Sequence, residues 1–107
     1  MNEKFDKKFK LNDKYKKDFQ ALQEIIKILK EEGLTITHYC QSEKIVQTQW
    51  DTNSTFLIAN EGAKAVKITR WPQGGLTVSF TNGFDDPKDP KRIRITAKLR
   101  EKGFDVA

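Results

Sequence analysis

The chain has 107 residues, with 20 Lys and Arg against 15 Asp and Glu, which gives a formal net charge of +5, and 36% of its residues are hydrophobic. A chain of this length buries roughly 60 to 70% of the surface that its unfolded form exposes, so we expect a single core and a single domain. No segment approaches the roughly 18 consecutive apolar residues of a membrane-spanning helix, and no apolar leader follows Met1. The lone Cys40 excludes an internal disulfide bond and fits a reducing compartment. We therefore expect a cytoplasmic protein that does not contact membranes.

Residues 1–11 form a basic segment with few hydrophobic side chains. The segment contains Lys4, Lys7, Lys8 and Lys10. We interpret it as an N-terminal extension that precedes one domain spanning residues 12–107.

A long amphipathic helix is predicted directly after this extension. Five apolar side chains recur at the spacing of one helical face: Tyr15, Phe19, Leu22, Ile26 and Leu29. Asn12 or Asp13 can cap the start of the helix, because a short polar side chain accepts hydrogen bonds from free backbone N–H groups. Gly33 can end the helix in the left-handed conformation. One face of this helix must therefore lie on an apolar surface.

The middle of the chain is typical of short β-strands separated by turns. Segments rich in β-branched and aromatic residues span 34–40, 45–50, 55–59, 65–71 and 76–80. Short connections favour antiparallel neighbours. The predicted fold class is α+β: one long N-terminal amphipathic helix packed on one face of an antiparallel sheet, a meander of about five or six strands.

Residues 90–102 fit two structures. Asp89, Pro90 and Gly103 are placed to cap, start and end a helix. Against this, four apolar side chains alternate strictly with polar ones, which is typical of a strand: Ile93, Ile95, Ala97 and Leu99. We predict a strand and keep the helix as the alternative.

No residue pattern matches a metal site or a cofactor site. His38 and Cys40 lack the further ligands that zinc requires, and the loop with Asp85, Asp86 and Asp89 lacks the spacing of a calcium loop. We expect His38 and Cys40 to be partly buried structural residues, and we expect no cofactor.

One catalytic alternative is metal-free RNA cleavage. A histidine or tyrosine surrounded by cations can act on a scissile phosphate. The candidates are His38, Tyr39, Lys67, Arg70 and Arg94. They are assembled from composition rather than from a motif, so the prediction is a protein that is not an enzyme.

The positive charge is concentrated in two clusters. Residues 4–17 hold seven Lys and two acids, and residues 88–102 hold seven Lys or Arg and two acids, so each cluster carries a net +5. Arginine presents forked donors that suit phosphate and carboxylate groups. If residues 90–102 form a strand, the cations Arg92, Arg94, Lys98 and Arg100 share one face.

The leading functional hypothesis is a module that binds nucleic acid, most readily single-stranded, on a basic sheet face with stacking aromatic rings. The predicted binding residues are Arg92, Arg94, Lys98, Arg100, Lys67, Arg70, Trp71 and Tyr39. In the opposing interpretation, both aromatic residues are partly buried and the charges are ordinary solvated side chains.

A second hypothesis is a protein-binding function. A small chain with dense charge of both signs suits an inhibitor or regulator of a nucleic-acid-processing protein, of the kind that a phage or mobile element encodes. No membrane partner is expected under either hypothesis.

Overall fold

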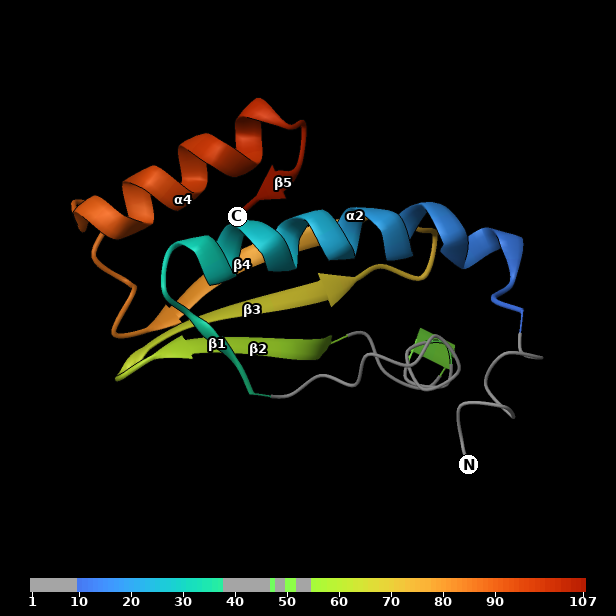
Figure 1. The fold of residues 1–107 in the computed structure, drawn as a ribbon, viewed down its shortest axis with the longest axis horizontal. Helices are drawn as coiled ribbons and strands as arrows, with labels where there is room; N and C mark the ends of the chain where they lie inside the picture. Colours follow the sequence, from blue (N-terminus) through green and yellow to red (C-terminus); the bar gives the residue numbers. More distant parts are fainter. Residues whose placement is uncertain (1–9, 38–46, 48–49, 52–54) are drawn as a thin grey trace.

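The computed structural model describes residues 10–37, 47, 50–51 and 55–107. Its elements, in chain order, are α2 (Asp13–Glu31), β1 (Thr35–Ile36), β2 (Thr55–Glu61), β3 (Lys64–Arg70), β4 (Leu76–Asn82), α4 (Pro90–Glu101) and β5 (Asp105–Val106). The strands form one five-stranded sheet in the order β1-β2-β3-β4-β5, with α2 running along it (Figure 1). The fold is therefore α+β, as the sequence predicts.

The long helix α2 confirms the helix predicted from the apolar periodicity. Asn12 occupies the N-cap position in an extended conformation. At the other end, Gly33 adopts a φ of 92°, which places the Leu34 amide 3.0 Å from the Leu29 carbonyl oxygen. This hydrogen bond satisfies a carbonyl that the helix leaves free, and Leu34 is buried. Of the predicted apolar stripe, Phe19 alone is only half-buried.

The sheet is antiparallel except at one edge. β2, β3 and β4 follow one another as antiparallel neighbours, and β1 pairs with β2 in the same sense. β5, in contrast, is parallel to β4. A strand that follows a helix returns to the sheet in the direction of the strand before that helix, so the insertion of α4 explains this departure from a pure meander.

The predicted strands at 55–59, 65–71 and 76–80 are confirmed within a few residues. The prediction at 34–40 is confirmed only at Thr35–Ile36, and residues 38–40 lie outside the described residues. The prediction at 45–50 is wrong where it can be compared: Gln47 and Trp50 are helical. Trp50 is buried, with its ring centroid 5.4 Å from that of Tyr15, so packing of one aromatic ring prevails over local strand preference.

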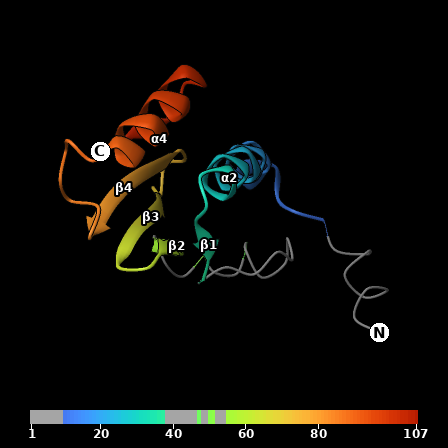
Figure 2. The ribbon, with the colours of Figure 1, turned by 60° about the vertical axis from the view of Figure 1, so that its left-hand side comes forward.

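The two faces of the sheet differ in what covers them. The register pairs Ile68 with Val78 and Arg70 with Leu76, so these side chains share one face, which we call the core face. Asp18 of α2 binds Arg70. Val66 and Phe80 extend the core face, and Arg92 of α4 stacks on the Phe80 ring. Both helices therefore contact the core face (Figure 2).

The opposite face of the sheet, which we call the far face, carries mostly small polar side chains. The register places Thr35, Ile58, Asn60, Ala65, Lys67, Thr69, Thr77, Ser79 and Thr81 on it. Among the described residues, this face therefore holds several threonines and one cation, Lys67.

Residues 90–101 form the helix α4, so the predicted strand is wrong. The Asp89 carboxylate accepts a hydrogen bond from the Lys91 amide, and Pro90 starts the helix. Gly103 adopts a φ of 86° and closes it. Only Ile95 and Leu99 are buried in α4. These two residues are one helical turn apart, so they share one face of the helix. Two apolar side chains are enough to form the narrow buried face of α4. The alternation of apolar and polar residues therefore did not determine the structure.

In the part of the chain that the structure describes, no helix is both long and apolar enough to span a membrane.

Candidate binding surface

Arg94 and Lys98 lie on the flank of α4 that faces α2. Both bind Glu32, with Arg94 Nη2 3.2 Å from Oε1 and Lys98 Nζ 2.7 Å from Oε2. The Glu32 side chain is only 8% exposed. The hydrogen bond from Lys98 lowers the pKa of the Glu32 carboxyl group, and Arg94 adds to this effect against the opposing effect of burial. These two cations therefore connect the helices, and the single carboxylate of Glu32 offsets one of their two positive charges.

The other two cations of the predicted row lie on a different flank of α4. Arg92 Nη1 donates to the Phe84 carbonyl oxygen at 2.9 Å, and its guanidinium carbon lies 4.9 Å from the centre of the Phe80 ring. Arg100 is exposed, and its guanidinium makes no hydrogen bond or ion pair with any residue that the structure describes. On a strand the four cations would share one face. On the helix they form two pairs on different flanks.

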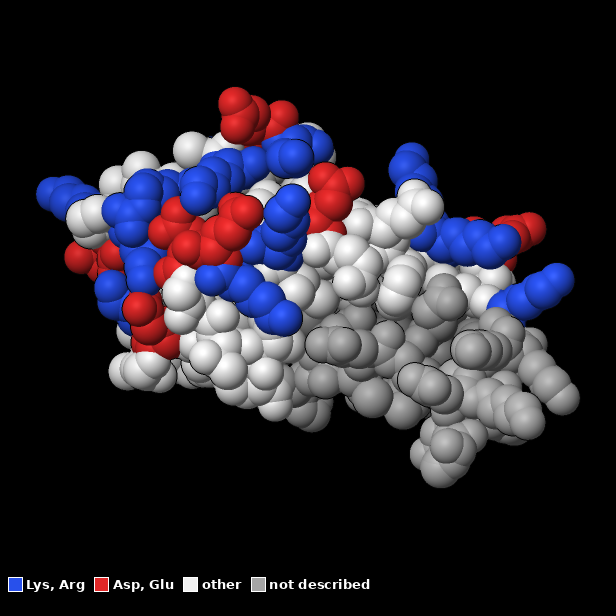
Figure 3. All heavy atoms as spheres, in the orientation of Figure 1, with Lys and Arg blue, Asp and Glu red and all other residues white. Residues whose placement is uncertain are grey.

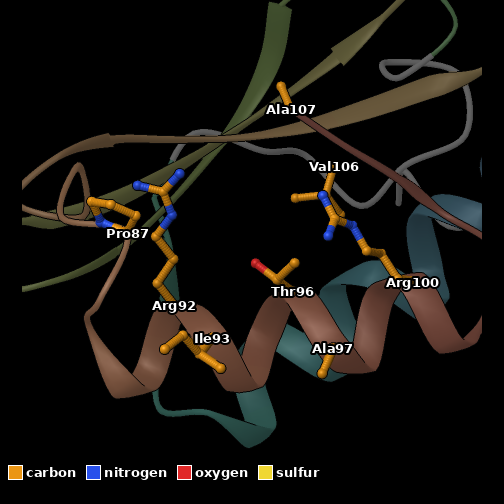
Figure 4. A pocket seen from close by; sticks show the side chains of 8 residues that line it. All are labelled: Pro87, Arg92, Ile93, Thr96, Ala97, Arg100, Val106 and Ala107. Atoms are coloured by element: carbon orange, nitrogen blue, oxygen red, sulfur yellow. The ribbon is translucent and has the colours of Figure 1, made fainter.

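A groove of about 420 Å³ lies between α4 and the β5 end of the sheet. It is lined by Pro87, Arg92, Ile93, Thr96, Ala97, Arg100, Val106 and Ala107, and we call it the α4 groove (Figure 4). Ile93 is 55% exposed, and it lines the groove together with the aliphatic side chains of Pro87, Ala97 and Val106. The lining contains two arginines and no acidic side chain. The groove therefore combines apolar surface with positive charge.

Charges of both signs surround α4 and the adjacent end of α2. Figure 3 shows Lys and Arg there with Asp and Glu interspersed among them. Lys91 forms an ion pair with Glu61, and Lys64 Nζ lies 2.7 Å from Asp89 Oδ2. The hydrogen bond from Lys64 lowers the pKa of the Asp89 carboxyl group. The second basic cluster of the sequence is therefore largely a network of ion pairs.

Arg70 is part of the core and not of an exposed surface. It is 7% exposed, and its Nε lies 2.8 Å from Asp18 Oδ2. Its guanidinium carbon lies 4.5 Å from the Tyr15 ring centre and 5.4 Å from that of Trp50. Asp18 also accepts a hydrogen bond from the Gly75 amide. The guanidinium of Arg70 is therefore not exposed, and its burial does not support the predicted role in ligand binding.

Lys67 and Trp71 lie on the other side of the sheet from α4. Trp71 is 45% exposed, and its Nε1 donates to Thr77 Oγ1 at 2.6 Å. Thr77 in turn donates to Asp105 Oδ2 at 2.9 Å, so a carboxylate lies near this ring. Tyr39 is outside the described residues. The structure thus divides the predicted binding residues among the α2 flank, the α4 groove, the core and the far face.

The residues considered for RNA cleavage are likewise not brought together where they are described. Lys67 lies on the far face, Arg70 in the core and Arg94 beside α2. His38 and Tyr39 lie outside the described residues. Among the described residues, no three His, Cys, Asp or Glu side chains are grouped so that they could hold a metal ion.

Sequence reasoning missed the α4 groove because it assigned Ile93 to the same buried row as Ile95. The signal that could have found it was the capping pattern of Asp89, Pro90 and Gly103. Taken as a helix from that pattern, the segment places Ile93 and Ala97 away from the buried pair of Ile95 and Leu99.

No protein-family model, curated protein sequence or solved structure matches this chain.

Proposed function

We propose that this protein is a non-enzymatic binding module that engages another protein through the α4 groove. The observation that carries the proposal is the exposure of Ile93 in a groove that also holds Arg100, whose guanidinium has no partner among the described residues. Arginine is enriched at the energetically important centres of protein interfaces, and the fully buried core of an interface is more apolar than its rim.

The surroundings of the groove support a protein ligand. Charged side chains of both signs, joined in ion pairs, lie on the α2 side of α4, and the pair of Lys98 with Glu32 is one of them. Interspersed charge gives an interface specificity and a fast encounter, whereas a polyanion is attracted best by a surface of one sign. An inhibitor or regulator of a nucleic-acid-processing protein, encoded by a phage or mobile element, is one form of this proposal.

A second candidate function is binding of single-stranded nucleic acid to the far face. The observation that favours it is the Trp71 ring, which is 45% exposed on the far face. Stacking of bases on such rings is tolerant of sequence. Among the described residues, Lys67 is the only cation that the register places on the far face. Asp105 lies close to Trp71 through Thr77, so neutralisation of a nucleic-acid backbone there is limited.

Capture from a lysate of the producing cells, with and without nuclease digestion, tests the class of ligand. We expect the immobilised full chain to retain one protein in stoichiometric amount after digestion. Recovery that disappears on digestion would instead support the nucleic-acid function.

A further inference from the structure

We propose that the α4 groove receives an acidic segment of the partner protein, with an apolar side chain seated on Ile93 and carboxylates bound by Arg92 and Arg100. This inference rests on the function proposed above and adds the chemistry of the partner.

The cations of the groove form a row with a fixed spacing. Arg92, Thr96 and Arg100 recur every four residues, and Figure 4 shows their side chains extending from α4 toward the β4 and β5 side. Eight residues of helix advance about 12 Å, so the two arginine backbones are separated by about two turns. A segment that lies across the groove can therefore present one carboxylate to each guanidinium, with the Thr96 hydroxyl between them.

Arg92 is already held in position for such a contact. Its Nη1 bonds the Phe84 carbonyl oxygen and its plane lies over the Phe80 ring, which leaves its other guanidinium donors for a ligand. A side chain that is ordered before binding loses less conformational entropy when the ligand arrives. Arg92 is thus suited to fix the register of the segment, and the exposed Arg100 to close on its far end.

Charge explains why the acidic segment is directed to this flank of α4. On the α2 flank, Arg94 and Lys98 share the carboxylate of Glu32, which offsets one of their two positive charges. None of the residues that line the groove has an acidic side chain. The two arginines of the groove are therefore less compensated than the cations of the α2 flank, and they lie where apolar side chains are exposed.

The apolar part of the lining favours a protein segment over a nucleic acid. Ile93, Ala97, Val106 and Pro87 offer aliphatic surface, and no aromatic residue lines the groove. Single-stranded nucleic acids gain much of their affinity from base stacking on aromatic rings. An aliphatic or aromatic side chain flanked by Asp or Glu matches both parts of this surface.

Selection from a random peptide library displayed on phage tests the inference, with the full chain as bait. We expect enriched peptides to carry Asp or Glu on both sides of an apolar residue, and Arg100→Glu to weaken their binding roughly 10- to 100-fold, as expected for loss of a charge-assisted pair. The matched control is Lys27→Glu, which makes the same charge change on an exposed site of α2 outside the groove and should leave binding within about twofold.

Peptides without an acidic bias, peptides that bind Arg100→Glu as well as the unaltered chain, or no enrichment at all would overturn the inference. These results leave the proposed function separately testable, because nuclease-resistant capture of a protein does not depend on the partner being acidic. Loss of that capture would instead remove the proposed function.

Discussion

Arg70 Nε lies 2.8 Å from Asp18 Oδ2, and this ion pair joins β3 to the middle of α2 with both side chains almost fully buried. Because Arg70 also stacks on Tyr15 and Trp50, the pair fixes where α2 and the aromatic residues meet. An arginine that the sequence suggested as a ligand residue is therefore a structural one.

The first prediction concerns this pair. Asp18→Ala leaves the Arg70 guanidinium buried without its counter-ion, so the free energy of unfolding should fall by about 3 to 5 kcal/mol. Urea unfolding measures it. Asp13→Ala is the control, since the Asp13 side chain is 94% exposed in its ion pair with Lys16 and should contribute less than about 1 kcal/mol. Equal effects of the two substitutions would contradict the structural role of Arg70.

The second prediction separates the helical and the strand structure of residues 90–101. On α4, Ile95 is fully buried and Ile93 is 55% exposed, whereas on a strand the two would share a face. Ile95→Ala should lower the free energy of unfolding by about 2 to 5 kcal/mol, and Ile93→Ala by less than about 1 kcal/mol. Similar losses from both substitutions would favour the strand.

The third prediction is a dependence of stability on pH through Glu32. Lys98 and Arg94 hold the pKa of this carboxyl group below its usual value of 4.5 in the folded protein. A lowered folded-state pKa contributes stability that is present above the unfolded-state pKa and is lost as the pH falls through the folded-state value. Glu32→Gln should therefore be less stable than the unaltered protein at neutral pH.

The difference between these two proteins should shrink as the pH falls below 4.5. Thermal unfolding followed across this range measures it. A difference that stays constant on acidification would show that the carboxylate charge does not hold α4 to α2.

The fourth prediction concerns nucleic acid on the far face. With Lys67 as the one cation that its described residues contribute, and with Asp105 near Trp71, this face should bind an oligothymidine with a dissociation constant no tighter than about 10 µM at physiological salt. Fluorescence anisotropy of a labelled oligonucleotide measures it. Tighter binding that Trp71→Ala abolishes would move the ligand site from the α4 groove to the far face.

Much of the fold could be predicted from the sequence because its signals are local. The apolar stripe from Tyr15 to Leu29 and the glycine at 33 determine α2, and the turns around residues 62 and 74 separate β2, β3 and β4. Residues 90–101 could not be assigned in the same way, since capping and alternation favour different structures there. In the structure, α4 contacts Glu32 and Phe80, and a sequence pattern within residues 90–101 does not reveal these contacts.

The candidate site was less accessible to sequence reasoning than the fold. Side-chain type alone indicated that arginines at 92, 94 and 100 are chemically important, but not which of them an acid within the protein would neutralise. Glu32 is separated from Arg94 by 62 residues, so its pairing depends on the tertiary structure. The exposure of Ile93 depends on the same structure.

The most direct test of the α4 groove compares how much nuclease-resistant protein is captured from lysate by three variants. Ile93→Glu alters the groove, Trp71→Ala alters the far face, and Lys27→Glu controls for added negative charge. We predict that Ile93→Glu retains less than about a tenth of the protein held by the unaltered chain, as expected for a central interface residue, and that the other two retain most of it. Full retention by Ile93→Glu together with loss in Trp71→Ala would contradict the proposal.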